Sequence, residues 1–348
     1  MSDLEKDPLA SSADQAAASG APSLEPKPVA SWQRIFIGPE GSLRPGWRFL
    51  LYLIAFAALQ AAIEFTTRPL FRMHGAKTPP LWAFLAGELT SFVAALVPAF
   101  FLAQYVENRP FGAYGLPLKG AFGRQFWMGV AWGIGAISLL LFVMRGMHTF
   151  YFGGLAEHGL RILKFGAFWA VLFLVVGLFE EFVTRGYTQF TLAQGMGFWP
   201  AAFLLSFIFG ALHFPQEYAL GDRWGAWAGS LGAASIGLFF CLTLRRTGAL
   251  WFAVGMHASW DWGESFLYST PDSGTLAQGH LLSSSFHGKP WLTGGPVGPE
   301  ASVLVFVLIA LMWVVFDRIY PARKGVPDQP LGPPALTWND TRSGPASG

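Results

Sequence analysis

Three short polar motifs interrupt apolar segments of the sequence, and their side chains are of the kinds that activate water. They are Glu180-Glu181-x-x-x-Arg185, Phe209-x-x-x-His213 and His257-x-x-x-Asp261. The first follows an apolar run that, with its continuation, is long enough to cross a membrane. Ionisable groups at membrane depth are costly and rare, and by default they mark functional sites. Together the three motifs predict an active site within a membrane.

The chemistry that fits these residues is hydrolysis by an activated water. A carboxylate held away from bulk water is a better general base, and Glu180 is the candidate for that role. His213 can orient the same water, and the pair of His257 and Asp261 can stabilise an oxyanion. Alternatively, these four side chains can hold a Zn²⁺ ion with an open coordination position. Glutamate plus histidine suffices to activate water, so no cofactor is favoured and zinc remains the alternative.

Helical spacing assigns the two glutamates to different faces. Glu181 and Arg185 are four residues apart, so they share a face and form a favourable pair. Glu180 points about 100° away from Glu181 on a helix. We therefore predict a supporting Glu181–Arg185 pair on the helix surface, which leaves Glu180 free for the water. Phe209 and His213 also share a face, which places the aromatic ring beside the imidazole.

The composition predicts an all-α, polytopic membrane protein. Of the 348 residues, 53% are hydrophobic and only 13% are charged, whereas a soluble domain carries roughly 25% charged residues. The net charge of +2 is too small to imply a nucleic-acid partner. The single cysteine, Cys241, excludes an internal disulfide and any metal site built from several cysteines.

About eight segments have the length and apolar character of transmembrane helices, and we expect the active site inside their bundle. They are Trp47–Phe65, Trp82–Tyr105, Phe126–Met144, Gly166–Phe190, Trp199–Phe214, Ala226–Leu244, Ala249–Leu267 and Ser302–Ile319. These segments define a membrane-embedded domain over residues 38–320. The flanking residues 1–37 and 321–348 are rich in Ala, Ser, Pro and Gly, and we predict that both tails are disordered.

The Lys and Arg residues of the loops predict how the protein is oriented in the membrane. With eight spans, the side that holds both termini carries nearly twice as many Lys and Arg residues as the other side. Positive charge collects on the cytoplasmic side of membranes, so both termini are expected in the cytoplasm. The long loop from Tyr268 to Ala301 then lies on the opposite side. The expected location is the bacterial inner (plasma) membrane.

Other acidic residues in apolar segments are weaker candidates for function. Glu64 and Glu88 lie in the first two predicted spans, and Glu88 is expected to link helices. Glu264 follows Asp261 by three residues and can support it or simply end a helix. Asp317 and Arg318 end the last span and are expected to anchor it at the interface.

The three motifs, in this order and spacing, resemble those of the CPBP (Abi) family of membrane proteases, which includes type II CAAX prenyl endopeptidases. The resemblance covers Gly38–Tyr320 in architecture, and its specific core is Val176–Trp262. The family pattern is Glu-Glu-x-x-x-Arg, then Phe-x-x-x-His, then His-x-x-x-Asn or Asp. The sequences around Arg185-Gly186-Tyr187 and Arg245–Trp251 are also similar to those of bacterial members.

The resemblance implies an intramembrane endopeptidase that acts on membrane-associated peptides or proteins. It implies that Glu180 activates the water with the help of His213, while His257 and Asp261 stabilise the oxyanion. Glu181 and Arg185 would support them. One position departs from the prenyl endopeptidases, since Asp261 stands where these have Asn. An ionised Asp cannot donate a hydrogen bond to an oxyanion.

Two other functions remain open. The same fold can serve as a non-catalytic membrane module, for example in bacteriocin immunity or as a scaffold for a partner protein. A transporter can use buried glutamates and histidines as a proton relay. Each motif alone also has a structural explanation, such as a salt bridge at a helix end, but the coincidence of all three favours an enzyme.

Overall fold

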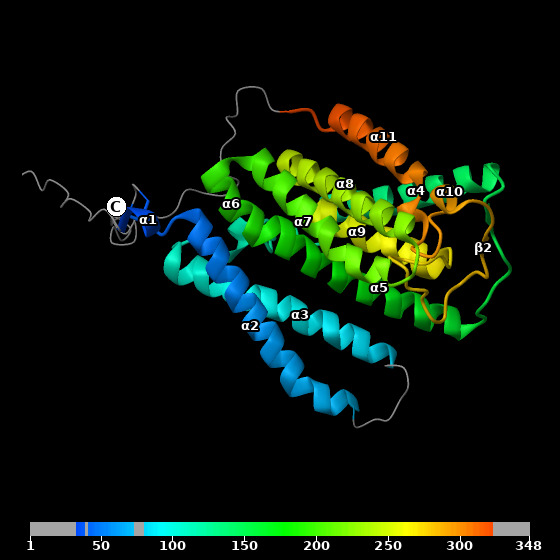
Figure 1. The fold of residues 1–348 in the computed structure, drawn as a ribbon, viewed down its shortest axis with the longest axis horizontal. Helices are drawn as coiled ribbons and strands as arrows, with labels where there is room; N and C mark the ends of the chain where they lie inside the picture. Colours follow the sequence, from blue (N-terminus) through cyan, green and yellow to red (C-terminus); the bar gives the residue numbers. More distant parts are fainter. Residues whose placement is uncertain (1–32, 39–40, 73–79, 323–348) are drawn as a thin grey trace, which may run out of the picture.

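The computed structural model describes residues 33–38, 41–72 and 80–322 and confirms an all-α, polytopic membrane protein. Most of both predicted tails lies outside the described residues. Within the first tail, Gln33–Phe36 forms one helical turn, α1. Figure 1 shows an elongated bundle in which α2 and α3 lean out from one side of the other helices.

The main helices follow one another along the chain. They are α2 (Pro45–Arg72), α3 (Leu81–Phe101), α4 (Arg124–Gly146), α5 (Leu160–Glu181), α6 (Thr188–Met196), α7 (Phe198–Tyr218), α8 (Arg223–Thr247), α9 (Trp251–Trp262) and α11 (Val303–Ile319). Short elements complete the chain: the π-helices η1 (Leu102–Val106), η3 (Phe182–Tyr187) and η4 (Gly263–Leu267), the 3₁₀-helices η2 (Phe111–Tyr114) and η5 (Pro299–Ala301), the α-helix α10 (Pro290–Thr293), and the strands β1 (Phe150–Tyr151) and β2 (Ser285–Phe286).

Each of the eight predicted spans coincides with a helix, but the number eight is not confirmed. Within the described part of the chain, six helical stretches are long and apolar enough to cross a membrane. The other two are α9 with η4, which have 12 and 5 residues, and α11, which has 17 residues. A full crossing takes about 20 residues, so these two are short for that purpose. The six long apolar helices identify the protein as an integral membrane protein.

The centre of the bundle is α9, which packs against α4 on one side and α5 on the other. Nearly every residue of α9 is buried, as expected of a helix that is apolar all round. Glycines allow α4 to approach it closely. A Cβ at Gly129 would lie 2.1 Å from the carbonyl oxygen of Phe252, and one at Gly133 would lie 2.1 Å from Ser259 Oγ. This small-x-x-x-small spacing is a common way to pack helices in membranes.

The first motif lies where α5 changes its geometry. The helix widens into the π-helix η3 directly after Glu181, and the backbone at Gly186 leaves helical geometry (φ −84°, ψ −114°) before α6 begins. The whole stretch from Leu160 to Met196 has 37 residues, about 55 Å of helix. The hydrocarbon core of a bilayer is only about 30 Å thick. The break therefore divides a longer helix near the glutamates.

Residues 268–301 close one end of the bundle. Strand β2 pairs antiparallel with β1, which ties the segment to the end of α4. The segment continues through α10 and η5 into α11, and η5 packs against α8. In Figure 1 these elements gather at the end of the bundle where α10 and β2 are labelled.

Candidate active site

A buried ionic network joins the first and third motifs. Glu181 and Arg185 form an ion pair, with 2.6 Å between Oε1 and Nη1. The same Oε1 lies 2.9 Å from Nδ1 of His257 on α9. The side chains of Glu181 and Arg185 are 0% and 1% exposed. The predicted pair is confirmed, but its placement on the helix surface was wrong, because α9 packs on α5 here and α7 and α8 pack on η3.

Aromatic rings and a glycine hold the guanidinium of Arg185. The rings of Phe209 and Phe240 lie 4.6 and 5.3 Å from its central carbon, within the range of cation–π interactions. Its Nε donates to the carbonyl oxygen of Gly237 on α8. A Cβ at Gly237 would lie only 2.4 Å from Arg185 Nη2, so only glycine leaves room for this side chain. Phe209 therefore has a second role beside its predicted contact with His213.

The contact with Glu181 determines how His257 presents its ring. A carboxylate only accepts hydrogen bonds, so the proton of this contact is on Nδ1. Nε2 then faces two more carboxylates, with Glu180 Oε2 at 3.6 Å and Asp261 Oδ2 at 3.5 Å. Both distances exceed the usual hydrogen-bond range. Nε2 is therefore oriented toward the acidic groups without being tied to either of them.

His213 on α7 is also fixed through its Nδ1. This atom lies 2.8 Å from the carbonyl oxygen of Phe209, which accepts only, so Nδ1 carries the proton. The Phe209 ring packs edge-on against the imidazole at 4.7 Å, as the spacing of the motif predicts. The neutral ring then has its lone pair on Nε2, where it can accept a hydrogen bond.

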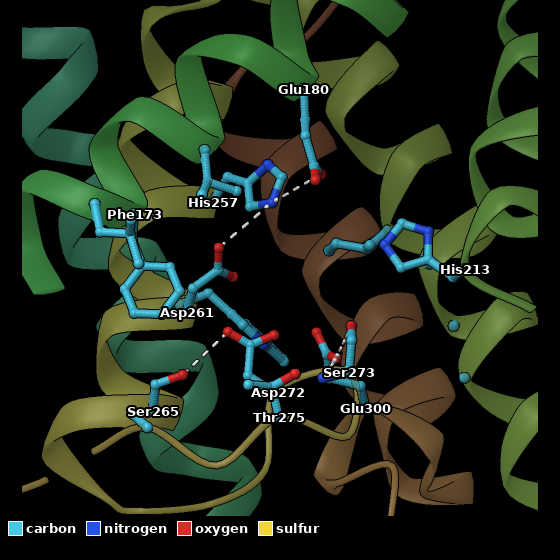
Figure 2. A pocket seen from close by; sticks show the side chains of 18 of the residues that line it. Phe173, Glu180, His213, His257, Asp261, Ser265, Asp272, Ser273, Thr275 and Glu300 are labelled. Carbon is cyan, nitrogen blue, oxygen red and sulfur yellow. Dashed lines mark hydrogen bonds and ion pairs between the residues drawn. The ribbon is translucent and has the colours of Figure 1, made fainter. Parts of the chain in front are cut away.

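The predicted site residues meet at one cavity of about 310 Å³. Its lining includes Glu180, His213, His257 and Asp261, contributed by α5, α7 and α9. Figure 2 shows Glu180 and His257 together at one end of the cavity, with His213 across from them. The convergence expected from the three motifs is therefore present, whereas Glu181 and Arg185 lie behind it in the protein interior.

The cavity carries further acidic groups that the motifs did not reveal. Glu88 on α3, Glu217 on α7, Asp272 in the 268–301 segment and Glu300 on η5 also line it. No lysine or arginine is among the described residues that line it. Partial burial of the Asp272 carboxyl, together with the charges of Asp261 and Glu300, raises its pKa well above its usual range. A carboxyl with a raised pKa gives up its proton most readily beside a positive charge, so this acidic lining without lysine or arginine suits cationic rather than anionic groups.

The other acidic residues considered from the sequence lie in different settings. Glu88, which was expected to link helices, lines the cavity. Glu264 is fully buried and accepts a hydrogen bond from Trp260 Nε1 at 2.8 Å. Glu64 lies outside the cavity and accepts from Gln60 on its own helix. Asp317 pairs with Arg246 of α8, so it ties α11 to its neighbour.

The four candidate zinc ligands fit a zinc site poorly. His257 and His213 each hold Nδ1 in a hydrogen bond and offer Nε2, as metal-bound histidines commonly do, so the positions of the four groups decide the fit. Among the described residues, Glu180, His213, His257 and Asp261 do not form a group of ligand atoms within 4.8 Å of one another. Zinc ligands lie about 2.0–2.3 Å from the ion, so side-chain movement would be required to assemble this site.

The same part of the chain carries a family signature. Residues 162–263 match the family model of type II CAAX prenyl endopeptidase Rce1-like. This match confirms the resemblance to the CPBP family. It begins in α5 and ends after α9, so it contains all three motifs. At the family level it supports a protease, while α2, α3, α4 and the whole 268–301 segment lie outside it. No curated protein matches the sequence significantly.

Proposed function

We propose that the protein is an intramembrane endopeptidase that hydrolyses peptide bonds of membrane-associated substrates with a water activated by Glu180 and His213. The observation that carries this proposal is the cavity between α5, α7 and α9, which receives a free carboxylate and two oriented imidazoles. The family of the matching segment supports a protease.

The first step is activation of the water. The carboxylate of Glu180 makes no ion pair with Lys or Arg among the described residues, and its side chain is 27% exposed toward the cavity. One water can donate one hydrogen to Glu180 and the other to Nε2 of His213. Its oxygen lone pair is then free to attack the peptide carbonyl carbon. As the new C–O bond forms, Glu180 takes the proton as general base and later delivers it to the leaving amine.

His257 supplies the donor for the oxyanion. Because Glu181 fixes the proton on Nδ1, Nε2–H donation requires the imidazolium form, and the adjacent carboxylates of Glu180 and Asp261 balance that charge. This assignment answers the problem raised by Asp261, since the aspartate need not donate. Donors aimed at developing negative charge are commonly the largest catalytic contribution.

The proposed substrate is a peptide or protein that reaches the cavity from the lipid bilayer. The cavity lies among helices that cross the membrane, and the acidic lining favours peptide segments with basic or neutral side chains. We place the protein in the bacterial inner membrane with both termini in the cytoplasm, from the distribution of Lys and Arg. Prenylation of the substrate is tested by offering matched peptides with and without the lipid.

Cleavage of a quenched fluorescent peptide by the purified protein in detergent tests the proposal. We expect cleavage by the wild type and its loss in Glu180→Gln. The matched control is Glu64→Gln, which removes a carboxylate from a membrane helix outside the cavity and should keep full activity. Comparing protein termini in membranes of cells with wild type or Glu180→Gln then identifies natural substrates.

Two outcomes would contradict the proposal. Equal cleavage by wild type and Glu180→Gln would show that another group or a contaminant does the chemistry. Absence of any changed terminus in the membrane comparison, together with no peptide cleavage, would favour a non-catalytic membrane module. Loss of wild-type activity on chelation, restored by Zn²⁺, would replace the metal-free mechanism with a metal-dependent one.

A further inference from the structure

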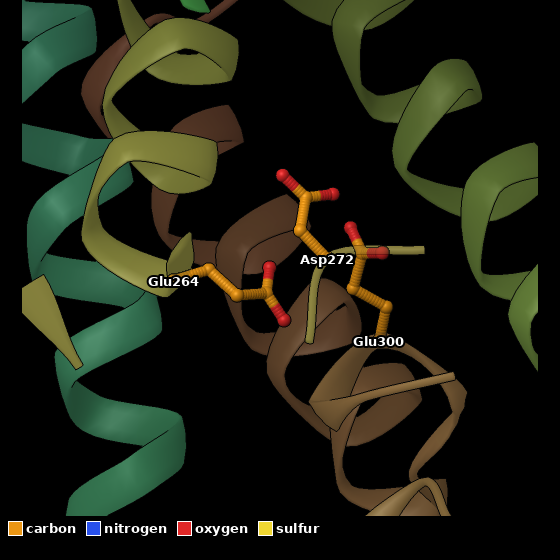
Figure 3. Close-up of side chains that lie close together, drawn as sticks. All are labelled: Glu264, Asp272 and Glu300. Atoms are coloured by element: carbon orange, nitrogen blue, oxygen red, sulfur yellow. The ribbon is translucent and has the colours of Figure 1, made fainter. Parts of the chain in front are cut away.

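A second group of carboxylates lies at the end of the cavity away from Glu180. Glu264 on η4, Asp272 in the 268–301 segment and Glu300 on η5 each place a carboxylate oxygen within 4.8 Å of the others. They come from three separate parts of the chain, and Figure 3 shows the three side chains close together, with Glu264 extending toward the other two. None of them belongs to the three motifs or is needed for activation of the water.

Each carboxylate uses one oxygen to hold its position. Glu264 Oε2 accepts from Trp260 Nε1 at 2.8 Å, and Asp272 Oδ2 accepts from Ser265 Oγ at 3.1 Å. Glu300 Oε2 accepts from both the backbone nitrogen and Oγ of Ser273, at 3.1 Å each. These donors fix the three groups and leave the second oxygen of each available to a ligand.

One of these second oxygens has no partner although it is buried. Glu264 is 0% exposed, and its Oε1 has no hydrogen-bond partner among the described residues. Its carboxylate points from η4 toward Asp272 and Glu300 (Figure 3). A buried polar atom without a partner is destabilising, and more so when it is charged. Of the three carboxylates, none forms an ion pair with a described lysine or arginine.

We infer that Glu264, Asp272 and Glu300 bind a divalent cation of the Ca²⁺ class. All three ligands are oxygens, which hard cations prefer, and no nitrogen or sulfur ligand is present in the group. Ca²⁺–O distances of about 2.3–2.6 Å allow two ligand oxygens to be up to about 5 Å apart across the ion. The three ligand oxygens lie within 4.8 Å of one another, which fits that range. Mg²⁺ demands near-ideal octahedral geometry at about 2.0–2.1 Å and is seldom held by protein groups alone, so the group suits it less.

A cation at this position would fasten the 268–301 segment to the bundle. Glu264 lies on η4, which directly continues the helix α9 that carries His257 and Asp261, whereas Asp272 and Glu300 lie near the two ends of the covering segment. Asp272 and Glu300 also line the cavity. The ion would therefore hold one wall of the cavity in place, and on the predicted orientation it would face the calcium-rich extracytoplasmic side.

Thermal unfolding of the full-length protein in a non-ionic detergent tests this site. After removal of metals with EDTA, we expect CaCl₂ added up to about 10 mM to raise the Tm, because the ion binds only the folded state. MgCl₂ at the same concentration should raise it less. Glu300→Gln should abolish the Ca²⁺-dependent shift, and its amide oxygen can still accept the hydrogen bonds from Ser273. Glu157→Gln, which removes a carboxylate paired with Arg161, should keep the shift.

Terbium luminescence provides a second readout on the wild type. Trp260 donates directly to Glu264, so its indole lies close enough to transfer excitation to a bound Tb³⁺ ion. We expect emission that Ca²⁺ displaces and that Glu180→Gln retains although proteolysis is lost. This separates the cation site from the proposed active site. The inference is overturned if Ca²⁺ neither raises the Tm nor displaces Tb³⁺. It is also overturned if Glu300→Gln and Glu157→Gln respond to Ca²⁺ equally.

Discussion

Replacing each glutamate of the first motif by glutamine should separate structural support from catalysis. Glu181 is fully buried between Arg185 and His257, whereas Glu180 is partly exposed to the cavity. Gln is nearly the same size as Glu but carries no charge and accepts with only one oxygen. Glu181→Gln should therefore lower stability, and Glu180→Gln should lower activity without a comparable loss of stability.

The size of the first effect follows from the burial of Arg185. Removing one partner of a buried ion pair costs about 3–5 kcal/mol, because the other charge is left uncompensated. Gly237 and the rings of Phe209 and Phe240 still contact the guanidinium, which favours the lower end of that range. A loss of about 3 kcal/mol lowers the Tm by about 5–10 °C in a protein of this size class.

The expected effect of Glu180→Gln is on the rate of cleavage. Loss of a general base reduces the rate by about 10²–10⁴-fold, whereas substitutions at positions without strong contacts change stability by about 0.5 kcal/mol or less. Differential scanning fluorimetry and peptide cleavage on the same preparations measure both quantities. If Glu181→Gln abolishes turnover at unchanged Tm while Glu180→Gln remains active, the roles of the two glutamates are reversed and the proposed mechanism is refuted.

Three further substitutions test other parts of the structure. Gly237→Ala should displace Arg185 and reduce both Tm and activity, whereas Gly135→Ala, whose Cβ meets no atom within 4 Å, should be neutral in both assays. Asp261→Asn should keep substantial activity in the peptide assay if catalysis is metal-free, and lose it if Asp261 binds Zn²⁺. Arg48→Met should lower the Tm by several degrees, because Glu107, its buried partner at 2.7 Å, loses its counter-charge.

The sequence predicted the motifs well. Helical periodicity and the free-energy cost of a charge inside a membrane can both be judged from neighbouring residues. Glu181 and Arg185 pair as i,i+4 spacing predicts, even though η3 is a π-helix. Phe209 packs on His213 for the same reason. Periodicity did not reveal that the pair is buried, since every face of an apolar span looks alike in sequence.

The sequence did not predict contacts between residues that are far apart in the chain. Glu181 and His257 are 76 residues apart, and only the packing of α5 against α9 brings them together. Asp272 and Glu300 lie in a loop rich in Ser and Gly, where no periodicity marks a function. The one available signal was the presence of carboxylates at both ends of that loop, close in sequence to the third motif and to the last span.

The contact between Glu181 and His257 changes the meaning of the aspartate at position 261. In the prenyl endopeptidases an amide at this position can itself donate to the oxyanion, and an aspartate cannot. Here the imidazole is fixed by Glu181 from the far side, so that Nε2 faces the cavity between Glu180 and Asp261. A carboxylate beside Nε2 favours the protonated ring and so keeps a donor in place. In the proposed mechanism, Asp261 therefore acts through His257, and the buried Glu181–Arg185 pair is what makes this arrangement possible.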